Sequence, residues 1–316
     1  MIKERIKLYD GNPIAMPGIY ARMPMVKYHA ADAAIEPSIS SSGLRTIFTQ
    51  SPKHYWATSP FNPKRVEDDE ESDALRFGRA AHHLLFGEEE FKKFFAIAPT
   101  ELGGEPFSLR RKVCKLWREA REAEGKSFLR REEMDQILGM RDSLADHSLV
   151  KAGILNGLIE TSWFTKHKGT GVWLKARPDT APTASLDFAD LKTTVAIDRR
   201  SLQYAIYDYG YFIQAGLVAM IVKDVLGEPL HSFSFVFIEK KPPHDIAVAV
   251  LKGNEIDRGI NAAEWAINRF AECYKAKKWP GRYENDEAQY IEMTEWQQNS
   301  IDERLTTGLT CSIPSK

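Results

Sequence analysis

The second half of the chain alternates strand-like and helical patterns, and this order limits it to few folds. Three runs rich in β-branched and aromatic residues, separated by Gly, Pro, Thr or Ser, occupy residues 158–194 and predict a three-stranded meander. A single long helix is expected from Asp198 to about Val225, because Gly227 then ends the pattern. We therefore predict an α/β fold with a mixed central β-sheet flanked by helices. The expected remainder of this core is two strands and a closing helix, at Ser232–Glu239, Ile246–Leu251 and Asn254–Lys278.

The segments around this core differ in character. Residues 1–37 carry Pro and Gly at short intervals, which predicts an extended N-terminal arm. Residues 38–278 are expected to form one domain, with helices near its start and a helical insertion at about 100–155. Residues 105–131 hold nine basic and four acidic residues, which fits a solvated helix face with i,i+4 ion pairs or a face that follows phosphates. The C-terminal tail, residues 279–316, is weakly patterned.

Composition excludes several classes of protein. The formal net charge of −1 provides no global field for nucleic acid, so any phosphate binding needs a local patch. The three cysteines are odd in number and far apart, which excludes a disulfide framework and a four-cysteine zinc or iron–sulfur site within one chain. The N-terminus lacks the apolar core of a signal peptide, and the longest apolar stretch is too short to span a membrane. We expect a soluble cytoplasmic protein with no membrane partner.

The candidate chemistry lies at the end of a predicted buried strand. Asp190 and Lys192 are two positions apart and therefore share one face of the strand. A return between neighbouring strands could bring Asp179 beside Asp190. Two converging carboxylates form a hard oxygen site for Mg²⁺ or Mn²⁺, and a nearby ammonium helps to orient a nucleophilic water. An ordinary surface ion pair remains the alternative, since acid-x-Lys triplets such as Glu90–Lys92 and Glu124–Lys126 occur elsewhere in the chain.

Two helical residues could join this site. His82 follows the small residues Ala80 and Ala81, which permit close packing, and it could be a ligand or a satisfied structural histidine. Gln214 lies within an otherwise apolar helical stretch. A buried glutamine must find hydrogen-bond partners, so it is either a structural tie or a contact to water or phosphate.

Taken in order, these pieces resemble the PD-(D/E)xK nuclease superfamily, and within it the RecE-type exonucleases (exodeoxyribonuclease VIII-like, of phage recombination). The resemblance covers roughly residues 26–96 and 155–220. It rests on Ser40-Ser-Ser-Gly-Leu-Arg45 with Ser51-Pro-Lys-His-Tyr-Trp56, Phe77-Gly-Arg-Ala-Ala-His82, Arg177-Pro-Asp179, Asp190-Leu-Lys192 and Tyr207-Asp-Tyr-Gly-Tyr-Phe-Ile-Gln214.

The resemblance implies an exonuclease that degrades linear double-stranded DNA from 5′ ends in a prokaryotic or phage-infected cell. It implies a Mg²⁺ cofactor, which Mn²⁺ can replace, a partner protein that anneals the 3′ single strand, and a homo-oligomeric ring. Many relatives carry a tyrosine four residues after the glutamine, where this chain has Val218. The resemblance implies that the metal ligands are His82, Glu160, Asp179 and Asp190 and that the catalytic residues include Lys192 and the helix-motif glutamine Gln214. It implies DNA contacts at Ser42, Arg45 and Tyr211. Tyr207 or Tyr211 would take the place of the missing tyrosine.

Two other functions fit the same residues. The core could belong to an endonuclease of the restriction or repair type, which would also cut circular DNA. It could also belong to a protein that binds DNA ends without cutting them. The set of Asp179, Asp190 and Lys192 argues against the second alternative, because clustered charge is costly to a protein with no catalytic need for it.

Overall fold

The structure is a computed structural model that describes residues 2–65, 72–86, 88–159, 161–283 and 288–307. It divides into two units, Met1–Arg282 and Tyr283–Lys316. The second unit contains one helix, α12 (Glu295–Thr307), within its described residues. All elements discussed below belong to the first unit.

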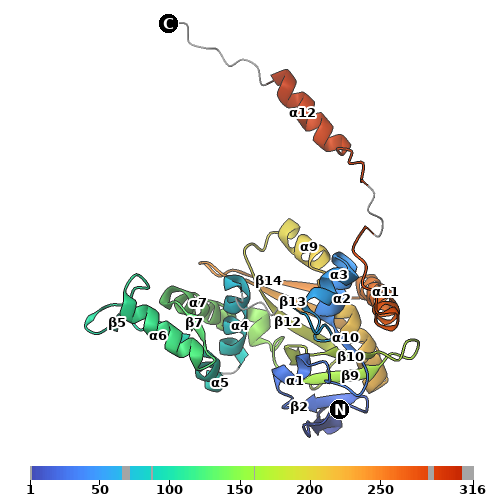
Figure 1. Ribbon diagram of the computed structural model, residues 1–316, viewed down its shortest axis with the longest axis horizontal. Helices are drawn as coiled ribbons and strands as arrows, with labels where there is room; N and C mark the ends of the chain where they lie inside the picture. The colour runs from blue at the N-terminus through green and yellow to red at the C-terminus, as the bar shows by residue number, and fades with distance from the viewer. Residues whose placement is uncertain (1, 66–71, 87, 160, 284–287, 308–316) are drawn as a thin grey trace. The chain divides into compact units, whose positions relative to one another are not determined.

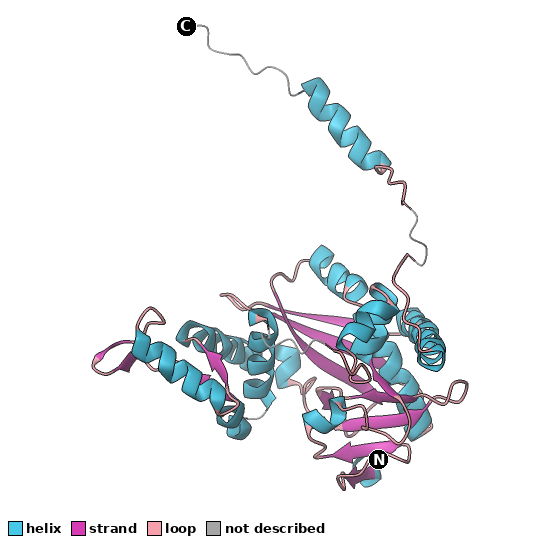
Figure 2. Cartoon of the chain, viewed as in Figure 1, coloured by secondary structure: helices cyan, strands magenta, loops and turns pink. Residues whose placement is uncertain are grey.

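The central sheet has five strands in the order β14-β13-β12-β11-β8 (Figures 1 and 2). Strands β12 and β13 run parallel over eight residue pairs, whereas the other pairings are antiparallel, so the mixed sheet is confirmed. The bounds are β8 Leu158–Ile159, β11 Thr180–Ala181, β12 Asp187–Thr194, β13 Ser232–Glu239 and β14 Ile246–Leu251.

A second five-stranded sheet has the order β1-β2-β9-β10-β3. The predicted single meander is wrong, because β9 and β10 lie in this sheet while β11 and β12 lie in the central sheet. Pro178 separates β10 from β11, and a proline cannot donate a hydrogen bond to a strand ladder. The bounds are β1 Ile6–Leu8, β2 Gly18–Ala21, β3 Ser38–Ser40, β9 Ser162–Lys166 and β10 Trp173–Ala176.

Residues 1–37, expected to form an extended arm, contribute two strands to this second sheet. Strand β2 pairs with β9, and a short 3₁₀ helix (Ile2–Arg5) precedes β1. Helix α1 (Met25–His29) follows, and its Tyr28 is buried in a hydrophobic cluster with Phe164 and Trp173. The N-terminal segment is therefore part of the packed core.

Helices cover both faces of the central sheet (Figure 1). One face packs against α2 (Ser41–Thr49), α3 (Pro52–Thr58), α10 (Tyr211–Leu226) and α11 (Asn254–Ala276). The other face packs against α4 (Asp73–Phe86) and α7 (Arg131–Asp146). Side chains alternate along a strand, so Phe188 of β12 enters the first core and Leu191 enters the second.

The expected single helix from Asp198 to Val225 is wrong, because the chain forms α9 (Arg199–Asp208) and α10 with a 58° bend between them. Gly210 lies at the bend with φ 67°, a left-handed conformation that glycine adopts without strain. Asp198 caps α9 as expected, and Gly227 ends α10. No single described helix is long and apolar enough to cross a membrane; only this bent pair passes that test by length and composition.

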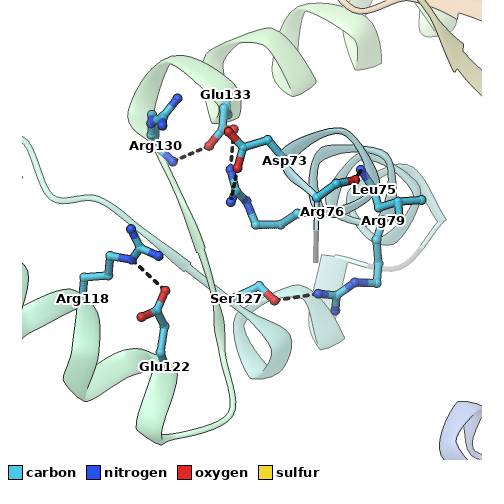
Figure 3. Close-up of polar contacts among 10 residues, drawn as sticks. Asp73, Leu75, Arg76, Arg79, Arg118, Glu122, Ser127, Arg130 and Glu133 are labelled. Atoms are coloured by element: carbon cyan, nitrogen blue, oxygen red, sulfur yellow. Dashed lines mark hydrogen bonds and ion pairs between the residues drawn. The ribbon is translucent and has the colours of Figure 1, made fainter. Parts of the chain in front are cut away.

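Residues 88–151 form the insertion beside α4. Its helical character is as expected, but β7 pairs with β4 in parallel and was not predicted. Arg76 of α4 lies 2.8 Å from Glu133, and Arg79 donates to Ser127 at 2.6 Å, so two arginines tie α4 to the insertion (Figure 3). The elements are α5 Glu88–Phe94, β4 Phe95–Ile97, β5 Glu101–Leu102, β6 Glu105–Pro106, α6 Lys112–Ala123, β7 Ser127–Leu129, α7 and α8 Ser148–Lys151.

Candidate active site

The end of β12 brings an acid and a base together. Asp190 and Lys192 share one face of the strand, as the sequence predicts, and the Lys192 ammonium contacts Asp190 Oδ2. Asp190 is 1% exposed, so this carboxylate is almost completely removed from water. A buried charge requires a partner of opposite sign, and Lys192 provides it.

Asp179 approaches the same strand from the turn between β10 and β11. Its Oδ2 accepts a 2.7 Å hydrogen bond from the Leu191 N–H, which fixes the carboxylate beside Asp190. His82 of α4 lies with Nε2 2.9 Å from Asp179 Oδ1. Helix α4 is therefore brought to the turn before β11 and to β12, which lie about 100 residues later in the sequence.

The charged groups of this cluster shift one another's pKa values. Burial raises the pKa of Asp190, the negative charge of Asp179 raises it further, and Lys192 only partly offsets both. Burial opposes ionisation of Asp179 as well, but His82, Lys192 and the Leu191 N–H lower its pKa overall. The pKa of Lys192 is raised because the two carboxylates outweigh its burial. The site thus concentrates negative charge that a cation can neutralise.

Helix α10 supplies two further residues to the site. The Gln214 amide donates a 3.0 Å hydrogen bond to Asp190 Oδ1, so this glutamine has a partner in the site itself. The ring of Tyr211 lies 5.1 Å from Lys192 Nζ and also 5.1 Å from Arg45 Cζ. Burial lowers the pKa of Arg45, while Tyr211 and Asp190 raise it. Tyr207 is 71% exposed and stacks on Phe212, so Tyr211 is the tyrosine next to the lysine.

Ser42 lies apart from this cluster, in a cavity of about 240 Å³ beside the start of α2. Ser38 and Lys175 also line the cavity, and none of its described lining residues is acidic. Lys175 is 4% exposed and donates to the Tyr28 carbonyl at 2.6 Å, and burial lowers its pKa to about 8. Lys175 was not among the predicted site residues, although a lysine within the apolar run Trp173–Ala176 was a signal. Glu160 lies outside the described residues.

The comparisons with known proteins bear on this geometry. Residues 40–294 match a family model described as a PDDEXK-like domain of unknown function (DUF3799). The chain belongs to this family. No curated protein matches the chain.

One solved structure agrees with the family fold. A protein from Eubacterium rectale, described as a "putative exonuclease", is 15% identical with a TM-score of 0.59, over 91% of this chain and 99% of that chain. A second structure, of the protein SSO0001, is 15% identical over 73% of this chain and 76% of that chain, but its TM-score of 0.30 is too low to indicate a shared fold. The family and the first structure's fold support a nuclease with a PD-(D/E)xK core.

PD-(D/E)xK nucleases generally use divalent metal ions. His82, Asp179 and Asp190 offer an imidazole and two carboxylates, which are chemical types that bind such an ion. In the described part of the chain no three His, Cys, Asp or Glu side chains are arranged as a ready metal site. Lys192 and Gln214 contact the two oxygens of Asp190. Lys192 therefore provides the counter-charge of Asp190 in this structure.

Proposed function

We propose that this protein is a metal-dependent exonuclease that degrades linear double-stranded DNA. The observation that carries the proposal is the convergence of Asp179, Asp190 and Lys192 at the end of β12, in a PDDEXK-like fold. A divalent ion, Mg²⁺ or Mn²⁺, held by the two carboxylates and His82 would activate water and neutralise phosphate charge. Glu160 is a further proposed ligand.

The protein's own residues then have distinct tasks. Gln214 and Lys192 hold the Asp190 carboxylate, and the Leu191 N–H holds that of Asp179. Lys192 also places a positive charge where negative charge grows on the scissile phosphate, which stabilises the transition state. Arg45, whose guanidinium lies 5.1 Å from the Tyr211 ring, would add a second cation near the same phosphate.

Cleavage from 5′ ends is the proposed polarity. The Ser42 cavity supports it, because a terminal phosphate fits a recess that combines a helix N-terminus, a buried ammonium and no described acidic residue. The resulting 3′ single strand would serve a single-strand annealing protein in DNA recombination. A ring of several copies and a cytoplasmic location in a prokaryotic or phage-infected cell belong to the same proposal.

Two end-labelled duplexes and a closed circle test this function. The pure protein is incubated with Mg²⁺ and linear duplex labelled at either the 5′ or the 3′ ends, beside covalently closed circular DNA. Early release of 5′ label with an intact circle is expected. Cleavage of the circle would indicate an endonuclease instead, and absence of cleavage with Mg²⁺ or Mn²⁺ would indicate a protein that only binds DNA.

Matched variants show whether the cleavage comes from this site or from a contaminating nuclease. Asp190→Asn removes the charge at nearly constant volume and should abolish cleavage while the far-ultraviolet circular dichroism stays unchanged. Asp257→Asn changes an exposed acid in the first turn of α11 and should cut as the wild type does.

A further inference from the structure

A groove of about 480 Å³ lies at the C-terminal end of β12, the strand that carries Asp190 and Lys192. Residues 193–196, which follow Lys192, form one wall, and α9 forms the other with Arg200 and Tyr204. Tyr209 and Lys240 also line it. The volume is that of a small-ligand site, about 300–1,000 Å³, so it suits separated nucleotides and not a base-paired helix.

The charge of the groove is positive. Arg200 and Lys240 line it, and none of its described lining residues is acidic. Asp198, two residues before Arg200, is used at the start of α9, where it accepts hydrogen bonds from the Arg200 and Ser201 N–H groups. Burial lowers the pKa of Lys240, which has no carboxylate partner among the described residues. An anion in the groove would supply the missing counter-charge.

Half-exposed aromatic rings connect the groove to the proposed catalytic lysine. Tyr204 and Tyr209 are 53% and 54% exposed, with ring centroids 5.4 Å apart. Tyr209 lies 5.9 Å from Tyr211, whose ring is 5.1 Å from Lys192 Nζ. Exposed rings beside cations are the usual platform for single-stranded nucleic acid, since every base has a face that stacks.

We propose that this groove binds the single-stranded nucleotides next to the scissile phosphate, with bases on Tyr204 and Tyr209 and phosphates at Arg200 and Lys240. The inference rests on the proposed nuclease function and adds the path of one strand. The proposed groove gives α9 a role in substrate binding. It also gives the bend at Gly210 a functional consequence. The bend places Tyr209 between the groove and Tyr211.

Binding in an inactive background tests the groove. With Asp190→Asn present in every protein, fluorescence anisotropy measures the affinity for a ten-nucleotide oligothymidine and for a blunt 20-base-pair duplex. Adding Tyr204→Ala should weaken the affinity for the single strand by about 5- to 100-fold. Tyr204→Phe keeps the ring and should bind within about twofold of the background protein. Arg200→Ala should weaken binding and flatten its salt dependence.

A control variant sets the outcome that would overturn the inference. Lys252→Ala changes an exposed lysine directly after β14 and should leave single-strand affinity unchanged. Equal affinity for Tyr204→Ala and the background protein would overturn the groove assignment, even if the wild type cuts DNA. Tyr204-dependent binding in a chain whose wild type cuts no DNA would instead overturn the proposed nuclease and leave the groove assignment standing.

Discussion

Gln214 of α10 donates its side-chain amide to Oδ1 of Asp190, 3.0 Å away on β12. The hydrogen bond joins α10, a largely buried helix of the first core, to β12, the strand that carries Asp190. Because Lys192 engages the other oxygen, the carboxylate has no freedom to turn. A carboxylate held in this way is already oriented for an ion.

Removing the Gln214 amide should therefore impair catalysis more than folding. Gln214→Met keeps the volume, loses the hydrogen bond to a charged group, and should lower the unfolding free energy by about 1.5–3 kcal/mol. The cleavage rate should fall about 10- to 100-fold, because partners of a metal ligand have effects of that size. Chemical denaturation and the end-labelled duplex assay measure both. The exposed Gln203→Met should change neither, and an unaltered rate for Gln214→Met would remove this glutamine from the site.

Lys192→Met should make the stability of the protein depend on a divalent ion. Without the ammonium, two buried carboxylates face each other, and the loss should be about 3–5 kcal/mol in chelator. Mg²⁺ should restore much of this stability, because an ion takes over the counter-charge, although cleavage stays lost. Urea denaturation with and without Mg²⁺ is the measurement.

A surface lysine provides the comparison for that experiment. Lys166 pairs with Glu36 where both side chains are over 40% exposed, so Lys166→Met should cost at most about 1 kcal/mol and show no response to Mg²⁺. If Lys192→Met is equally stable in chelator and in Mg²⁺, the two carboxylates do not form an ion site.

The buried Lys175 should give the protein a distinct pH dependence. Burial lowers its pKa to about 8 from 10.5, so between these values the unfolded chain holds the proton that the folded chain has lost. Stability from this group is therefore fully present above pH 10.5 and is lost as the pH falls through about 8. Relative to Lys175→Met, the wild type should gain up to about 1 kcal/mol per pH unit across this range. A constant difference between the two proteins would contradict the prediction.

The contact between α10 and α11 should not tolerate a methyl group. A Cβ on Gly216 would lie 2.1 Å from the backbone of Gly259, and backbone atoms cannot move aside as a flexible side chain can. Gly216→Ala should cost several kcal/mol through overpacking, read from thermal or chemical unfolding. Gly78→Ala, in α4, meets only Thr193 Oγ1 at 3.6 Å and should be neutral or stabilising by up to about 1 kcal/mol. Equal effects of the two changes would show that the helices can separate.

Much of the site arrangement could be predicted from the sequence because strand alternation alone places Asp190 and Lys192 on one face. The strands β13 and β14 were predicted with the bounds that the structure has, since apolar runs with clear ends define them. The place of Asp179 beside Asp190 could be predicted on one assumption, that the strand after Asp179 pairs with β12. The role of each residue is still a prediction.

Other features could not be predicted, because they depend on contacts between distant segments. A glycine inside a helical pattern is compatible with a straight helix, so Gly210 gave no sign of a bend. The short strand β2 pairs with β9, which lies about 140 residues later, and β1 pairs in turn with β2. The ammonium of Lys175 finds its partner in Tyr28, whose carbonyl accepts its hydrogen bond and whose ring lies 5.2 Å from Nζ.

Asp190 and Leu191 are adjacent residues on β12, and they face opposite cores of the protein. Inserting or deleting one residue within Asp187–Thr194 would exchange the two faces, so a carboxylate would enter the apolar core and a leucine would enter the site. Length changes in this strand therefore damage folding and chemistry at once. A lengthened turn at residues 182–186 would leave the register of the strand intact, so insertions that preserve activity should be tolerated there first.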